Sequence, residues 1–96
     1  MHVILLRFGT HKGAAKDHMA AHNAWIDQGV DDGIFQCVGS LEVGGGFILA
    51  HGEADADLRR RVATDPFVVH GVVTAEILQV TPNRVVPPLA FLKAAG

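Results

Sequence analysis

Histidine is the residue type of this chain best matched to chemistry, because its side chain gains and loses a proton near neutral pH. The chain has six of them, which are His2, His11, His18, His22, His51 and His70. His22 is the most informative, since it lies three residues after Met19 and four before Ile26 on the apolar face of an amphipathic helix. An imidazole taken out of water there needs a hydrogen-bond partner. A carboxylate partner would make it a base with an orienting group, whereas a backbone carbonyl would make it a core histidine.

Asp65 is the candidate partner of His22. It directly precedes Pro66, which is the pattern of a helix cap, and that role needs no chemistry. A functional role depends on whether this loop folds back toward His22, which two helices lying side by side on one sheet face would allow. His18 lies four residues before His22, but a pair at this spacing without an inner glutamate or a third ligand is a weak zinc signal. We therefore expect no metal site, and we expect the remaining histidines to be solvated at the surface: His2, His11, His51 and His70.

Two further positions are candidates for a binding site. Arg7 follows a run of aliphatic residues, and an arginine in such a place usually has an anionic partner, here Asp65, Glu76 or a bound anion. Ser40 follows Gly39 where a strand breaks. Its hydroxyl or backbone N–H either faces a pocket or belongs to an ordinary turn.

The apolar pattern predicts elements in the order strand, helix, strand, strand, helix, strand. The strands are expected at residues 2–8, 34–41, 47–51 and 72–80, and the helices at 15–32 and 54–64, with one more helical turn after Asp65. Gly33 ends the first helix, Asp55 can cap the second, and residues 44–46 are typical of a hairpin turn rather than of a phosphate-binding loop. This is the βαββαβ order of an α+β, ferredoxin-like fold, with a four-stranded antiparallel sheet and both helices on one face. In the first and last strands, apolar residues occur at both odd and even positions, so both faces of the sheet are apolar. This pattern predicts that a second copy covers the face without helices, which gives a dimeric α+β barrel.

Size and composition exclude several classes of protein. With 96 residues, the chain is expected to be a single domain, residues 1–96, whose irregular C-terminal tail from about 81 to 96 packs on the partner subunit. A formal net charge of −2 gives no basic surface for nucleic acid, and the run 59–61 of three arginines is typical of a solvated helix face. The apolar runs are too short to span a membrane, and residues 1–8 do not have the pattern of a secretory signal. Cys37, mid-strand and alone, is expected to be an inert small hydrophobe in a cytoplasmic protein.

Three segments resemble the YCII-related (YciI-like) family. They are the helix AAHNAWIDQGVDDG, the strand IFQCVGSL, and the segment TDPFVVHGVV with its Asp-Pro-aromatic pattern. The resemblance implies a dimeric ferredoxin-like α+β barrel, similar to muconolactone-isomerase-like proteins, in a family where some members act as lyases or dehalogenating enzymes on ring compounds. It also implies a histidine–aspartate active centre, carried here by His22 and Asp65. Ser40 stands where the family has a proline, which alters the pocket wall.

Two functions follow from these residues. In the first, the chain is a small enzyme in which His22 is the general acid or base, Asp65 orients it, and Arg7, Gly39, Ser40 and Phe67 contact a small cyclic or carboxylate-bearing substrate. Proton abstraction, isomerisation or elimination would suit this arrangement, and we expect neither a cofactor nor a metal. In the second, the same cavity binds a ligand without turnover, or the dimer docks to another protein.

Overall fold

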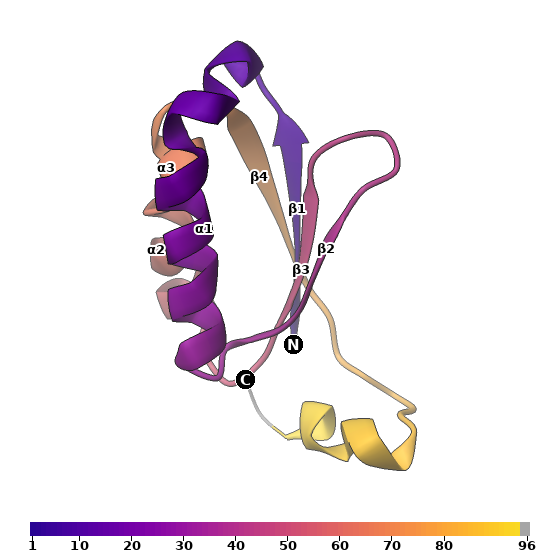
Figure 1. Cartoon of the computed structure of the whole chain (residues 1–96). Coiled ribbons are helices and arrows are strands. Elements are labelled where there is room, and N and C mark those ends of the chain that lie inside the picture. Colours follow the sequence, from indigo (N-terminus) through magenta and orange to yellow (C-terminus); the bar gives the residue numbers. More distant parts are fainter. Residues whose placement is uncertain (95–96) are drawn as a thin grey trace.

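The computed structural model describes residues 1–94, which fold into one antiparallel sheet with helices on a single face (Figure 1). The strands are β1 (His2–Phe8), β2 (Phe35–Ser40), β3 (Gly46–Ala50) and β4 (Val73–Gln79). Their order across the sheet is β2-β3-β1-β4, and each neighbouring pair is antiparallel. The central place of β1 agrees with its nearly continuous apolar sequence. The predicted ferredoxin-like α+β fold is therefore confirmed.

Three α-helices pack on the sheet. They are α1 (Ala15–Asp31), α2 (Asp55–Ala63) and the single turn α3 (Pro66–Val69). A 3-10 turn, η1 (Lys12–Ala14), leads into α1. Gly33 follows α1 with a φ of 75°, the left-handed conformation that ends a helix, as the sequence predicts. The predicted extra helical turn is α3, with Asp65 as its N-cap and Pro66 at its first position.

The core lies between the sheet and the helices. At one end of the core, α1 packs closely against β2 of the sheet. A Cβ added at Gly29 would lie 2.2 Å from the ring of Phe35, so only glycine leaves room for that ring. The ring also meets Trp25 edge-on, with centroids 5.1 Å apart. The buried apolar side chains of this core are Ile4, Leu6, Phe35, Ile48, Ala50, Leu58, Val62, Phe67, Val72 and Val73.

Two predictions about polar residues near α2 are wrong. Asp55 does not cap the helix, because Ala54 occupies the N-cap position and no side chain caps it. The Asp55 carboxylate instead accepts one hydrogen bond from Arg59, at 3.0 Å, and lies 3.0 Å from Nε2 of His2. His2 is not at the surface but 2% exposed, since its side chain lies on the same face of β1 as Ile4 and joins that strand to α2.

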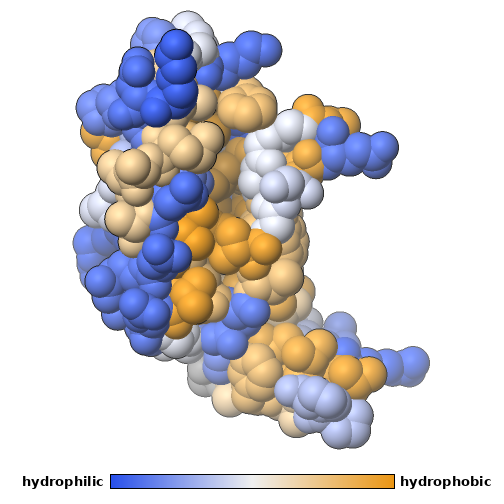
Figure 2. Space-filling view, in the orientation of Figure 1, coloured by the Kyte–Doolittle hydropathy of each residue, from blue (hydrophilic) through white to orange (hydrophobic). Residues whose placement is uncertain are grey.

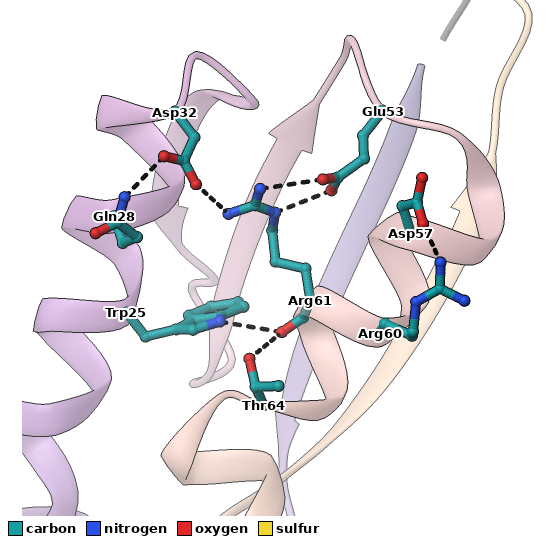
Figure 3. Close-up of polar contacts among 8 residues, drawn as sticks. All are labelled: Trp25, Gln28, Asp32, Glu53, Asp57, Arg60, Arg61 and Thr64. Carbon is teal, nitrogen blue, oxygen red and sulfur yellow. Dashed lines mark hydrogen bonds and ion pairs between the residues drawn. The ribbon is translucent and has the colours of Figure 1, made fainter.

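The arginine run on α2 is only partly solvated, which corrects the prediction for Arg61. Its guanidinium makes two hydrogen bonds to Glu53, at 2.9 and 3.0 Å, and one to Asp32 at 2.8 Å (Figure 3). The hydrogen bonds to Glu53 raise the pKa of Arg61, and the bond from Arg61 lowers the pKa of the Asp32 carboxyl. The backbone carbonyl of Arg61 also accepts from the indole N–H of Trp25 at 3.1 Å. This residue therefore ties α2 to the end of α1.

The second face of the sheet carries no helix (Figure 1). Strand register places Cys37, Leu49, Val3 and Leu78 in one row across all four strands on this face. Cys37 and Leu78 are exposed, and Leu49 and Val3 are half-buried. This apolar row is the surface that the sequence expects a second copy to cover.

The C-terminal tail projects away from the sheet and the helices (Figure 1). Its prolines do not leave it wholly irregular, because residues Pro87–Lys93 form a 3-10 helix, η2. Leu92 is buried, while Leu89 and Phe91 are each 42% exposed. The last two residues of the predicted tail lie outside the described part of the chain. No helix among residues 1–94 has the length and apolarity needed to cross a bilayer.

Candidate functional site

The His22 and Asp65 side chains meet although they lie 43 residues apart in the sequence. Nδ1 of His22 is 2.7 Å from Oδ1 of Asp65. The Asp65 side chain is 0% exposed and that of His22 is 10% exposed. The loop between α2 and α3 thus folds back toward α1, which is the condition that the sequence left open.

The N-terminus of α3 places the Asp65 carboxylate. Oδ1 accepts the backbone N–H of Phe67 at 3.0 Å, so the same oxygen caps α3 and contacts the imidazole. Oδ2 is buried and has no hydrogen-bond partner within residues 1–94. An ionised carboxylate only accepts hydrogen bonds, so it selects the tautomer of His22 that carries its proton on Nδ1. The structural and the functional roles of Asp65 are therefore compatible.

The imidazole plane is held by an aromatic ring on α3. Phe67 stacks on His22 with a centroid distance of 4.0 Å and an interplanar angle of 6°. Trp25 lies on the same helix with its centroid 6.0 Å from that of His22. With Nδ1 bonded to Asp65 and one ring face covered by Phe67, the remaining polar atom is Nε2. Within the described chain Nε2 has no hydrogen-bond partner.

His22 lines a cavity of about 370 Å³ between α1 and the end of the sheet where β2 and β3 are joined. The walls are mostly apolar, and include Leu6, Phe8, Met19, Ile26, Phe47 and Phe67. Figure 2 shows this hydrophobic surface in the hollow between α1 and the β2–β3 hairpin. The cavity has the size and apolar character common in small-molecule sites.

The cavity includes most of the residues that the sequence proposes for binding. Gly39, Ser40 and Phe67 line it, together with the helix stripe of Met19 and Ile26. One polar residue that is not among the sequence candidates also lines it, namely Asn23, which directly follows His22 on α1. The only signal in the sequence is that adjacency, because side chains flanking an apolar stripe lie at its edge.

Arg7 lies outside the cavity, contrary to the expectation that it binds substrate. Leu6 and Phe8 line the cavity, and side chains alternate along a strand, so Arg7 between them points to the opposite face of the sheet. There its guanidinium lies 3.3 Å from Glu76, and both side chains are about half exposed. The sequence allows Asp65, Glu76 or a bound anion as the partner of Arg7, and in the structure the partner is Glu76.

The other histidines lie elsewhere. His18 does not join His22 but stacks on His70, with centroids 3.9 Å apart. His51 is half-buried and its Nε2 lies 3.1 Å from the carbonyl oxygen of Ala94. Among residues 1–94, no group of three or more histidine, cysteine, aspartate or glutamate side chains is arranged to hold a metal ion.

This arrangement can move a proton. A neutral imidazole with its proton on Nδ1 presents a basic Nε2 to a neighbouring molecule, and the adjacent carboxylate stabilises the imidazolium that forms. The mostly apolar walls lower the local dielectric constant, which strengthens such electrostatic effects. The geometry is that of a general base or acid with its orienting group.

Comparison with known proteins gives a likeness in fold. No family model matches the chain, and no curated protein matches it. Among solved structures, 5-chloro-2-hydroxyhydroquinone dehydrochlorinase from Burkholderia phenoliruptrix AC1100, in complex with 2,5-dihydroxybenzoquinone, is similar with a TM-score of 0.67 and 18% sequence identity. The match covers 83% of this chain and 93% of that one. The likeness shows that the two chains share an α+β, ferredoxin-like fold.

Proposed function

We propose that the chain is a YciI-like protein and a small cofactor-independent enzyme, which transfers a proton on a small cyclic molecule in a lyase, isomerase or dehalogenase type of reaction. One observation carries the proposal. His22, whose Nδ1 is bonded to the buried Asp65, lines a cavity, and its Nε2 has no hydrogen-bond partner within residues 1–94. The dehydrochlorinase of the same fold, which was solved with a ring compound, supports the choice of substrate and reaction class.

The reaction would begin when Nε2 removes a proton from a C–H or O–H group of the ligand, leaving its electron pair on the ring system. The imidazolium is stabilised by the adjacent Asp65 carboxylate. In an isomerisation, Nε2 then returns the proton to a different atom of the ligand. In an elimination, the electron pair expels a leaving group such as halide, and the proton later passes to solvent. Gly39, Ser40 and Phe67 line the cavity in which these steps would occur.

A solvent-exchange experiment tests the proposal without knowledge of the natural substrate. Cyclic ketones, phenols and hydroxyquinones are incubated with the protein in D₂O, and incorporation of deuterium at carbon is measured by NMR. We expect at least one compound to exchange faster with the wild-type protein than with His22→Ala. Arg7→Ala is the matched control, because Arg7 lies on the other face of the sheet, and it should exchange like the wild type. Equal exchange in the presence of wild type and His22→Ala, for every compound, would contradict an enzymatic role of His22.

The alternative is a non-catalytic module that binds a small ligand or another protein. The mostly apolar cavity favours it, since such walls serve binding as well as catalysis. A ligand that binds with the same affinity to wild type and His22→Ala, and that exchanges no proton with either, would identify the chain as this module.

We also propose that two copies associate through the open sheet face. In each copy, the row formed by Cys37, Leu49, Val3 and Leu78 is an apolar surface. In a two-fold symmetric dimer, this row would pack against the same row of the second copy. The exposed Leu89 and Phe91 of η2 would then contact the partner. We place the protein in the cytoplasm, where the unpaired thiol of Cys37 stays reduced.

A further inference from the structure

We propose that the cavity beside His22 selects an uncharged ring compound that carries hydroxyl or carbonyl groups, and that it rejects carboxylic acids. This inference rests on the proposed function for the identity of the site, and it adds the charge class of the ligand. The inference therefore excludes carboxylate-bearing compounds, which the sequence leaves among the possible substrates.

The first argument is the charge around the cavity. Within the described chain, its lining includes no lysine, arginine, aspartate or glutamate. Arg7, the cation that could have paired with an acid, is bonded to Glu76 on the opposite face. A carboxylate in this cavity would lose its hydration without gaining a cationic partner from the wall.

The second argument is the charge of the His22–Asp65 pair itself. With a neutral imidazole the pair has a net charge of −1, and with an imidazolium its net charge is zero. The pair is therefore never positive overall, and while the imidazole is neutral, the Asp65 carboxylate behind the ring repels an anion. A cation also gains little, because Asp65 is 0% exposed and is not part of the cavity lining.

The third argument is the kind of polar group that the cavity does offer. Besides His22, its polar side chains are Asn23 on α1 and Ser40 at the end of β2. Both are uncharged, and each can donate as well as accept a hydrogen bond, which suits hydroxyl and carbonyl substituents. The aromatic rings of Phe8, Phe47 and Phe67 provide surfaces for a flat molecule. A volume of about 370 Å³ exceeds the roughly 150 Å³ of an engineered cavity that binds benzene, so a single substituted ring fits.

Three compounds with the same ring test the charge preference. They are 4-hydroxybenzyl alcohol, 4-hydroxybenzoate and 4-hydroxybenzylamine, which are neutral, anionic and cationic at pH 7.5. Binding is measured by titration followed with ¹H–¹⁵N NMR, and the fluorescence of Trp25, the single tryptophan, gives a second readout near His22. We expect the alcohol to shift the signals of α1 and β2 and to bind at least about tenfold more tightly than either charged compound. Equal or tighter binding of the benzoate or the amine would overturn the inference.

A gain-of-function variant tests the same inference in the other direction. Met19 lines the cavity and is 43% exposed, so Met19→Lys adds a cation to the wall while its charged end can remain hydrated. We expect this variant to bind 4-hydroxybenzoate at least about tenfold more tightly than the wild type does. Val30→Lys is the matched control, since Val30 is exposed on the same helix and outside the lining, and it should leave the affinity unchanged. An equal gain in both variants, or no gain in Met19→Lys, would contradict the inference.

The two proposals can fail separately. If the neutral ring binds in the cavity but no compound exchanges a proton, the ligand class stands and the enzymatic function is wrong. If a carboxylic acid binds and exchanges a proton in a manner that depends on His22, the enzymatic function stands and the ligand class is wrong.

Discussion

Asp65 Oδ1 lies 2.7 Å from Nδ1 of His22 and 3.0 Å from the backbone nitrogen of Phe67, so one carboxylate oxygen both orients the imidazole and caps α3. The stacking of Phe67 on His22 adds a second contact between the same two elements. The position of α3 on α1 therefore sets the geometry of the candidate site.

Replacement of Asp65 should separate its two roles. In Asp65→Asn the amide oxygen can still cap α3, but the charge that stabilises an imidazolium is lost. We expect the rate of proton exchange by His22 to fall about 10²-fold or more, which is the usual size of a general acid–base contribution. The amide nitrogen would replace the unpartnered Oδ2, so the free energy of unfolding should fall by about 1–3 kcal/mol. Exchange rates per folded molecule, with folding followed by circular dichroism, test this prediction, and an unchanged rate would contradict the role of the charge.

Replacement of Gly29 should show how closely α1 approaches the sheet. A Cβ at this position would lie 2.2 Å from the Phe35 ring, so Gly29→Ala forces the ring or the helix to move. We expect a loss of about 1–3 kcal/mol in the free energy of unfolding, which exceeds the gain of up to about 1 kcal/mol in helix propensity. Denaturant unfolding provides the measurement. Gly13→Ala is the control, because nothing lies within 4 Å of its added Cβ, and a loss as large in that variant would argue against a steric cause.

Acid should weaken the contact between α2 and β1. The hydrogen bond from Arg59, and then that from His2, lower the pKa of Asp55 below its usual value. Because the folded-state pKa is the lower one, the ionised carboxyl contributes stability above its unfolded pKa of about 3.9, and this contribution is lost as the pH falls through the folded-state value. In Asp55→Asn we expect lower stability than the wild type at neutral pH and a shallower decline below about pH 4. Unfolding curves recorded from pH 7 to pH 2 test this, and parallel declines in the two proteins would refute it.

A charge on the open sheet face should prevent association of two copies. Leu49 lies in the middle of the apolar row, opposite both Val3 and Cys37, so Leu49→Glu places a carboxylate at the centre of the proposed interface. We expect sedimentation equilibrium to give a dimer for the wild type and a folded monomer for this variant. Val69→Glu is the control, since Val69 is 61% exposed on α3, and it should remain dimeric. A wild-type protein that is monomeric at all concentrations would show the proposed interface to be wrong.

Much of the fold could be predicted from local sequence. Runs of β-branched and aliphatic residues predict all four strands, the glycine after α1 predicts its end, and the Asp65-Pro66 pair predicts α3. The errors concern contacts between elements that are distant in sequence. His2 is buried because β1 is one of the two central strands and its side chain contacts Asp55 of α2, and Arg61 is engaged because it meets Glu53 and Asp32.

The sequence predicts the two central residues of the site better than it predicts the residues that line the cavity. The helical stripe indicated that His22 faces the sheet, and the cap pattern located Asp65, but their distance depends on how α3 packs on α1. The place of Arg7 differs from the prediction because the unbroken aliphatic run before it in β1 hides the alternation of side chains between the two sheet faces. Asn23 is not predictable as a cavity residue, because an asparagine at the edge of a helix face has the same sequence pattern as a solvent-exposed residue.

The most direct measurement of the central claim is chemical rescue of His22→Ala. Removal of the ring leaves space beside Asp65, and free imidazole can occupy it and supply the missing base. We predict that this variant exchanges no proton with a ligand that the wild type deuterates, and that millimolar imidazole restores part of the rate. A variant that retains the wild-type rate without imidazole would contradict the claim that the His22–Asp65 pair carries the chemistry.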